Sequence, residues 1–328
     1  MNKVSTIIPD DIYALSLIPG IGNESLKKLV NSGSTLTNLI SYPEDKLRLL
    51  VKGIRASSIL ALKNEMPAFQ DEARARLSNY ERRGIQLISY WDKNYPPFFK
   101  LIDDAPVFLY AKGNLKLLEK KKCVAIVGTR ECTDRGVSVA LNLSRAFSKK
   151  GYCIVSGLAL GIDTAAHQGA LAENCPTIAV LVDVENIYPT ENEELASSIL
   201  EYKGLLIAEN PPGTKVFGGL FVKRDRLQSA FSLAVVPCET SINGGTMHTV
   251  RYSQKQNRLL FVPDYSEYKD YDTTNKGYAG IRQIIKDGRA KIISKKAASE
   301  IIDNLLPLKM KELEKGLETL ELRSDLFG

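Results

Sequence analysis

The alternation of strand and helix is clearest in residues 123–170, CVAIVGTRECTDRGVSVALNLSRAFSKKGYCIVSGLALGIDTAAHQGA. Val124–Val127 is a continuous apolar run, as expected for a strand buried on both faces, and it stops at Gly128-Thr129-Arg130. An amphipathic helical pattern follows from Arg135, and a second strand at Tyr152–Ser156 ends in another glycine-rich turn. Strand, turn, helix and strand in so short a span predict a right-handed βαβ unit of a parallel sheet.

The same alternation continues on both sides of this unit. Apolar runs predict strands near 123–127, 152–156, 177–182, 204–208, 233–238 and 259–262, with helical segments between them. Shorter strands are expected at Gln86–Ser89 and Val107–Tyr110, and a helix near 279–287 and a strand near 290–293 close the pattern. The predicted fold class is therefore α/β: an extended, Rossmann-like, doubly wound parallel sheet.

Residues 1–83 read as a small helical domain, in which the helices are interrupted at Ile18-Pro19-Gly20-Ile21-Gly22. A hairpin of this kind turns backbone N–H groups outward at a helix N-terminus, where a phosphate can bind. The pattern is similar to the helix–hairpin–helix modules of DNA-binding proteins, but a pair of helices in an interaction domain explains it equally well. Residues 84–297 then form the Rossmann-like domain.

Residues 298–328 are predicted to form a C-terminal helical tail. Its apolar residues fall at alternating spacings of four and three, which gives a one-sided helical stripe. We expect this stripe to dock on the parent domain, and it consists of Leu306, Met310, Leu313, Leu317 and Leu320.

Composition limits the class of protein. The chain has 328 residues, 44% of them hydrophobic, and its formal charge of +6 points mildly to an anionic partner. Five scattered cysteines without a C-x-x-C pair predict reduced thiols and no metal site. The sequence shows neither a signal peptide nor an apolar run of membrane-spanning length, so a cytoplasmic protein without a membrane partner is expected.

Three turns at predicted strand ends are expected to meet at one crevice, because ligands of such sheets bind outside the carboxyl ends of the strands. Glycines there let a ligand approach the backbone, and Asp163 is predicted to cap the helix that follows it. The candidate phosphate-binding residues of these turns are Gly128, Thr129, Arg130, Ser156, Gly157, Gly161, Asn243, Gly244, Gly245 and Thr246.

A further candidate lies between the predicted fourth and fifth strands of the domain. Its cations and aromatic rings suit single-stranded nucleic acid, since bases stack on rings while cations follow the phosphates. The alternative is a solvated basic helix face with Phe221 in the core. The residues in question are Lys215, Phe221, Lys223, Arg224 and Arg226.

The sequence contains few residue patterns that are typical of a catalytic site. The only histidines are His167 and His248, and His167 sits among alanines, as a packed structural histidine would. There is no P-loop, zinc-ligand spacing or G-x-S-x-G elbow. We therefore predict no catalytic residues and no cofactor.

Several motifs, in order, resemble those of the DNA-processing protein A (DprA/Smf) family: IVGTR, IVSGLALGIDTAAHQGAL, YPTEN, GLLIAENPPGT, FVKRDRLQSAFS and NGGTMHT. The resemblance covers roughly residues 84–295. It implies a Rossmann-type protein that binds single-stranded DNA, forms a homodimer and loads a RecA-type recombinase during natural transformation.

The resemblance also implies roles for particular residues. Arg130 would bind phosphate, Gly157 and Gly161 would shape the pocket, and Phe221, Arg224 and Arg226 would match the family motif F-P-x-R-N-R. Two positions of that motif differ here, because Val222 replaces the proline and Asp225 replaces the asparagine.

The predicted function is single-stranded DNA binding without catalysis, in DNA processing, transformation or a defence-related branch. The alternative is a nucleotide sensor, or a hydrolase similar to the cytokinin-activating phosphoribohydrolases. Such hydrolases use P-G-G-x-G-T-x-x-E. Asn243-Gly244-Gly245-Thr246 matches this pattern only in part, and Thr249 stands where the catalytic glutamate is needed.

Overall fold

The computed structural model describes residues 6–269, 271–294 and 297–327. The chain forms two compact units. The first comprises the described residues up to Lys93, with 106–108 and those from Thr319 onward. The second comprises residues 94–105 and the described residues between Leu109 and Glu318.

The first unit is mostly helical and also contains strand β1 (Ile85–Ser89). The helices are α1 (Pro9–Leu17), α2 (Asn23–Asn31), α3 (Leu36–Ser41), α4 (Glu44–Leu50), α5 (Ala56–Asn64) and α6 (Met66–Arg82). Leucines and isoleucines of α1 to α5 supply most of its core, and α6 adds Met66, Ala73 and Tyr80.

The predicted hairpin at 18–22 joins α1 to α2, and a second hairpin of the same form joins α4 to α5 at 51–55. Gly20 and Gly53 both adopt left-handed backbone, with φ of 89° and 83°, which favours glycine. In each hairpin the residue after the glycine donates its N–H to the carbonyl three residues back, Ile21 to Ile18 and Ile54 to Val51. This second hairpin was not predicted from the sequence.

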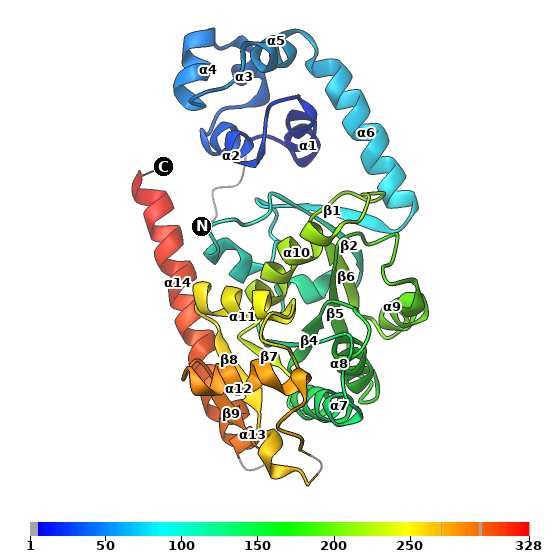
Figure 1. Ribbon diagram of the computed structural model, residues 1–328. Coiled ribbons are helices and arrows are strands. Elements are labelled where there is room, and N and C mark those ends of the chain that lie inside the picture. The colour runs from blue at the N-terminus through cyan, green and yellow to red at the C-terminus, as the bar shows by residue number, and fades with distance from the viewer. Residues whose placement is uncertain (1–5, 270, 295–296, 328) are drawn as a thin grey trace. The chain divides into compact units, whose positions relative to one another are not determined.

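The second unit contains a sheet whose strands lie in the order β2-β6-β5-β4-β3-β7-β8-β9 (Figure 1). Neighbours run parallel from β6 through to β9, and β2 is antiparallel to β6. The bounds are β2 (Phe108–Gly113), β3 (Cys123–Val127), β4 (Cys153–Ser156), β5 (Thr177–Leu181), β6 (Leu205–Ala208), β7 (Ala234–Pro237), β8 (Leu259–Pro263) and β9 (Lys291–Ile293). The predicted doubly wound α/β fold is confirmed.

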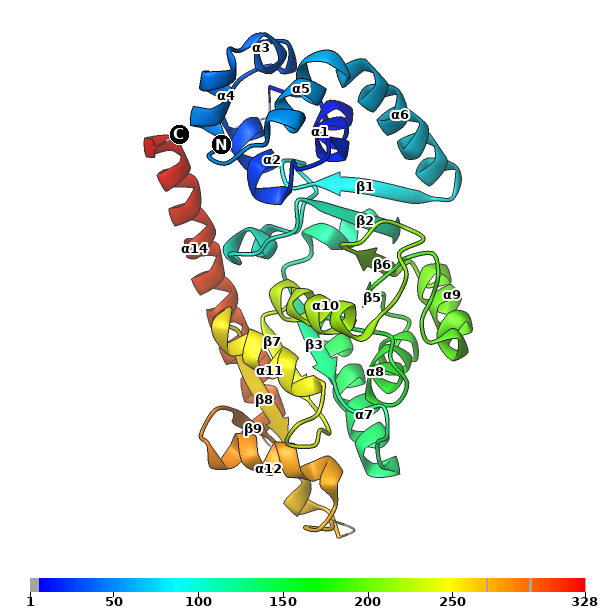
Figure 2. The same ribbon diagram turned by 45° about the horizontal axis from the view of Figure 1, so that its top comes forward.

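The strand order reverses between β3 and β7. From β3 the chain moves outward through β4, β5 and β6, then returns to β7 and continues through β8 to β9. Right-handed crossovers place the connecting helices of the two halves on opposite faces. Accordingly α7 (Asp134–Lys149) packs on α8 (Ile162–Leu171), and α10 (Gly218–Phe231) packs on α11 (Thr246–Lys255), as both views show (Figures 1 and 2).

Helices α9 (Glu193–Glu201), α12 (Ala279–Lys286) and α13 (Ala297–Glu300) complete the unit, and α14 (Leu306–Phe327) is the predicted tail helix. Of its apolar stripe, Leu306 and Leu313 are buried and Leu320 is exposed. Within the second unit, Lys309 Nζ lies 3.2 Å from Asn257 Oδ1. The N-terminal part of this stripe therefore docks on the parent unit.

All five cysteines are free, and Cys123, Cys153 and Cys238 are buried. Among the helices of the described ranges, none combines the length and apolarity that a bilayer span requires.

Candidate functional site

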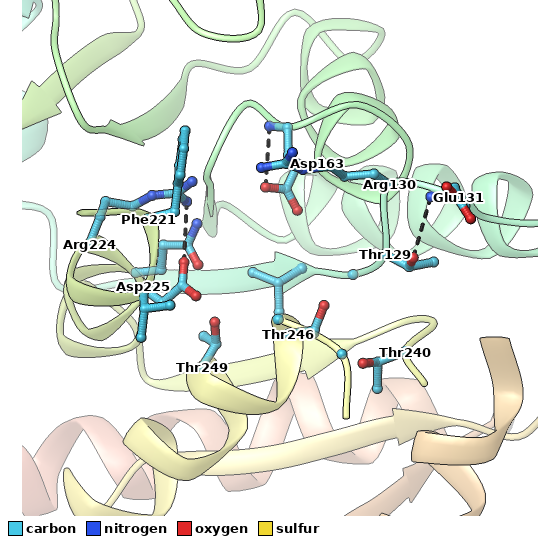
Figure 3. Close-up of a pocket in the computed structure, with 17 residues that line it drawn as sticks. Thr129, Arg130, Glu131, Asp163, Phe221, Arg224, Asp225, Thr240, Thr246 and Thr249 are labelled. Carbon is cyan, nitrogen blue, oxygen red and sulfur yellow. Dashed lines mark hydrogen bonds and ion pairs between the residues drawn. The ribbon is translucent and has the colours of Figure 1, made fainter. Parts of the chain in front are cut away.

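A pocket of about 370 Å³ lies at the carboxyl ends of β3 and β7, where the strand order reverses (Figure 3). Four segments of the second unit line it: the turn after β3, the turn before α8, one face of α10, and the loop that leads into α11. This is the position at which a doubly wound sheet binds its ligand. The charged and aromatic lining residues are Arg130, Glu131, Asp163, Phe221, Arg224 and Asp225.

The turn after β3 brings three predicted residues to the pocket, Gly128, Thr129 and Arg130. Thr129 donates its backbone N–H to the carbonyl of Glu239 (2.8 Å), which fixes the turn to the chain after β7. Arg130 is exposed, and in the described part of the chain its guanidinium pairs with no carboxylate. That guanidinium lies 5.4 Å from the ring centroid of Phe221, within the range of a cation–π contact.

The glycine turn after β4 is held by a buried carboxylate. Asp163 Oδ2 accepts hydrogen bonds from the backbone N–H groups of Gly157 (3.0 Å) and Ala159 (3.4 Å). The prediction that Asp163 caps the following helix is therefore wrong: Gly161 is the N-cap residue, and the carboxylate points back into the preceding turn. Burial raises the pKa of Asp163, against the opposing charge of Arg224 and these two backbone donors.

Three predicted residues of this turn, Ser156, Gly157 and Gly161, lie outside the pocket lining. Ser156 is fully buried and donates its hydroxyl to the Ile126 carbonyl (2.7 Å), which ties β4 to β3. Gly161 has a φ of 79°, and a Cβ there would lie 2.6 Å from the carbonyl oxygens of Thr129 and Arg130. Glycine at this position thus permits the two turns to touch.

Helix α10 presents one face to the pocket, formed by Phe221, Arg224, Asp225 and Gln228. These positions are spaced as neighbours along one side of a helix. Phe221 is half-buried, and its ring lies 5.4 Å from that of Tyr188 and tilted by 45°. The alternative that placed Phe221 in the core is wrong, because the half-buried ring lines the pocket and has Arg130 and Tyr188 as neighbours.

Arg224 forms the buried floor of the pocket. With its amide oriented to satisfy both donors, Gln228 accepts hydrogen bonds from Arg224 Nη1 and from the Gly157 N–H (3.0 Å). The guanidinium also passes directly over Gly157, where a Cβ would lie 1.7 Å from Nη1. Any side chain at position 157 would displace this arginine.

The carboxylate of Asp225 lies beside Arg224, with Oδ1 3.7 Å from Nη1. Burial raises the pKa of Asp225 to about 7; Arg224 lowers it, Asp163 raises it further and Arg130 lowers it. The pocket therefore places two arginines among three carboxylates, since Glu131 also lines it. It is not a basic cavity.

The loop before α11 contributes Gly244, Gly245 and Thr246, while Asn243 is exposed and does not line the pocket. Thr246 and Thr249, in the first turn of α11, both line the pocket, whereas the N–H groups of Met247 and His248 are donated to the carbonyls of Gly244 and Gly245. A helix N-terminus carries partial positive charge and free donors, which suit an anion.

The remaining basic candidates divide into two kinds. Lys215 and Lys223 are exposed, and Lys223 Nζ lies 3.3 Å from Glu209 Oε2. Arg226 is only 2% exposed and faces away from the pocket, bound to Asp104 Oδ2 (2.8 Å), to Glu209 Oε1 (3.0 Å) and to two backbone carbonyls. These contacts are those of a structural arginine.

His167 is fully buried, with Nδ1 2.9 Å from the Thr177 hydroxyl, and burial and the charge of Arg224 lower its pKa to about 3. This is the packed histidine expected from the sequence. The described residues hold no cluster of side chains suited to a metal ion. Gln228, Tyr188 and Thr240 were not among the predicted site residues. The sequence held a signal for two of them: Gln228 follows Phe221 by seven residues, and Tyr188 begins the YPTEN motif.

A doubly wound sheet with a pocket at its switch point, lined by glycine turns and a helix start, defines a Rossmann-type ligand-binding α/β protein. Residues 86–305 match the model of the DNA recombination-mediator protein A family, and the chain belongs to that family. The resemblance to DprA/Smf seen in the motifs is thereby confirmed.

Individual relatives support the assignment to this family. The chain is 35% identical over 212 residues to DNA processing protein DprA of Bacillus subtilis, across 64% of this chain and 71% of that one. It is 33% identical over 266 residues to protein Smf of Synechocystis, across 77% of this chain and 65% of that one.

Two solved structures are similar in fold. DprA of Streptococcus pneumoniae superposes with a TM-score of 0.73 at 24% identity, over 90% of this chain and 98% of that chain. DNA processing protein A of Helicobacter pylori superposes with a TM-score of 0.58 at 30% identity, over 68% of this chain and 96% of that chain.

Proposed function

We propose that this chain binds single-stranded DNA at the switch-point pocket and does not itself catalyse a reaction. One observation carries the proposal: the unpaired guanidinium of Arg130 lies over the half-exposed ring of Phe221 at the pocket. A ring can stack on an unpaired base while a neighbouring guanidinium holds the adjoining phosphate in a bidentate grip. The Helicobacter pylori relative supports this, because its structure is described as giving a single-stranded DNA binding mode.

The proposed roles follow from where each residue lies. Arg130, the turn of Gly128 and Thr129, and the helix start at Gly244, Gly245 and Thr246 would contact phosphate. The exposed Lys215 and Lys223, with Asn243, would follow the strand beyond the pocket. Gly157, Gly161, Ser156, Arg224 and Arg226 would hold these groups in place.

Family membership extends the proposal to partners. We include a RecA-type recombinase and a second copy of this chain among them, in transformation, defence or another pathway that processes DNA. Light scattering of the purified chain tests the homodimer, and co-sedimentation with recombinase filaments on oligothymidine tests the recombinase.

A free nucleotide is the second candidate ligand, because a pocket of about 370 Å³ is large enough for one nucleotide. Hydrolysis has less support. Thr249, rather than a carboxylate, lines the pocket where the partial hydrolase motif requires its glutamate.

The deciding experiment is fluorescence anisotropy with oligothymidine, a duplex hairpin and free nucleotides, each at two salt concentrations. We expect tight, salt-dependent binding of oligothymidine. Arg130→Ala should weaken it and flatten the salt dependence by about one phosphate contact, and Arg130→Lys should restore it only in part.

Lys116→Ala is the matched control, since Lys116 is an exposed cation of the same unit that lies outside the pocket. Tight binding of a free nucleotide with no binding of DNA would favour the sensor. An unchanged affinity and salt slope in folded Arg130→Ala would remove Arg130 from the site.

A further inference from the structure

A ring and a carboxylate lie next to each other on the pocket face of α10. Phe221 and Asp225 are four residues apart, so they lie one helical turn from each other on the same side, and both line the pocket (Figure 3). A base stacked on the ring of Phe221 would share the pocket with the carboxylate of Asp225. One helix face thus supplies both a stacking surface and a hydrogen-bonding group.

The carboxylate of Asp225 has unused acceptor capacity. Its side chain is 16% exposed, and its one ion pair, with Arg224 Nη1 at 3.7 Å, is too long for a hydrogen bond. Within the described ranges no group donates a hydrogen bond to it. An ionised carboxylate offers two oxygens and no donor, so a matching ligand must bring two neighbouring N–H groups.

Only one of the four bases offers that pair. The Watson–Crick edge of guanine carries N1–H and N2–H side by side, which a carboxylate accepts bidentately. Thymine places its single N–H between two carbonyls, which the carboxylate repels. Adenine and cytosine each present a donor beside an acceptor, and this arrangement suits an amide such as asparagine.

We infer that Asp225 is a specificity-determining residue that makes this pocket prefer guanine in a single strand. The inference rests on the proposed single-stranded DNA function and adds to it a base preference. It assigns a chemical consequence to the position where this chain carries aspartate in place of the asparagine of the family motif.

The test measures the affinity of the full chain for alternating oligonucleotides at pH 8, in lithium buffer so that guanines do not form quadruplexes. The probes are d(TG), d(TI), d(TA) and plain oligothymidine of equal length. We expect d(TG) to bind about tenfold more tightly than d(TA). The inosine oligonucleotide, which lacks the N2 amino group, should fall between them.

Two variants separate base recognition from simple charge. Asp225→Asn should still bind oligothymidine, lose the preference for d(TG) and gain affinity for d(TA). Glu131→Gln removes a negative charge from the same pocket lining without touching the α10 face, so it should raise all affinities alike and keep the guanine preference.

Equal affinity of the natural chain for d(TG) and d(TA) overturns the inference, and so does a guanine preference that survives in Asp225→Asn. In both cases binding of oligothymidine would leave the proposed function standing. If the folded chain bound no oligonucleotide, the proposed function and the base preference would fail together.

Discussion

Phe221 occupies an unusual place for a large apolar side chain, because its neighbours are Arg130 and Tyr188 at the surface. A ring in that position contributes little to the core and is available to a ligand. Its removal should therefore affect binding far more than folding.

We expect Phe221→Ala to weaken oligothymidine binding by about 1–3 kcal/mol, the range for loss of one base–aromatic stack. Titration and thermal melting of the same protein measure the two effects together. Removal of a ring from the core would instead cost about 3–5 kcal/mol of folding stability. A large drop in melting temperature would therefore contradict the stacking role.

The pH dependence of stability reports on Asp225. Its pKa near 7 in the folded chain exceeds the value of about 3.9 of an unfolded aspartate, so the native state binds more protons between these two values. The free energy of unfolding therefore falls as pH rises through that window. Burial is the first cause, with Arg224, Asp163 and Arg130 as the charged groups that face the carboxylate.

Asp225→Asn removes this titration. The variant and the natural chain should have similar stability near pH 4. The variant should gain relative stability up to pH 8, on the order of a few kcal/mol. Denaturant unfolding at several pH values measures the difference, in which the other titrating groups cancel. A stability difference that is independent of pH would show that Asp225 keeps an ordinary pKa.

At the scale of single residues, the sequence predicted which turns reach the pocket but not which contacts each side chain makes. Gly128, Thr129, Arg130, Gly244, Gly245 and Thr246 all line it. Arg226 could not be assigned correctly, since its partners Asp104 and Glu209 come from distant segments of the chain. The role of Asp163 was predicted wrongly, because a carboxylate at a helix start can accept hydrogen bonds either from the helix, as a cap, or from the preceding turn.

At the scale of elements, continuous apolar runs located the parallel strands to within one or two residues, since strands buried on both faces have no other pattern. The second hairpin, at 51–55, was missed because its Lys-Gly-Ile sequence lacks the proline that marked the first. In helix α14, the predicted apolar stripe distinguishes a residue that docks from one that does not. Leu313 is buried, whereas Leu322, outside the stripe, is 64% exposed.

Two alanine substitutions in α14 test this difference. Leu313→Ala should cost about 2–5 kcal/mol of stability, because it leaves a cavity beneath the helix. Leu322→Ala should stay within about 0.5 kcal/mol, as surface substitutions do. Urea unfolding compares them directly, and equal effects would mean that α14 does not dock through Leu313.

At the scale of the whole molecule, every residue that lines the pocket lies between Val127 and Thr249, in the second unit. The predicted boundary at residue 83 precedes β1, whereas the first compact unit extends to Lys93. We keep the three-part division of the chain as a proposal, in which residues 1–83 serve a role separate from the pocket.

A chain lacking residues 1–83 should bind oligothymidine within about twofold of the full chain, as expected for a pocket contained in a separate unit. Anisotropy titration measures this, with full-length Arg130→Ala as the example of a damaged pocket. A loss as large as that of Arg130→Ala, in a shortened chain of native circular dichroism, would place part of the DNA site in the N-terminal helices.

The reversal of strand order between β3 and β7 has a kinetic consequence. These two strands pair in parallel although the crossovers through β4, β5 and β6 separate them in the chain. Such long-range pairings form slowly, since the entropy of closing a long loop is lost before any contact is gained. The pocket exists only once this pairing is complete. Recovery of DNA binding at the proposed site should therefore trail recovery of helix content during refolding, and on the ribosome the pocket cannot form before β7 has been synthesised.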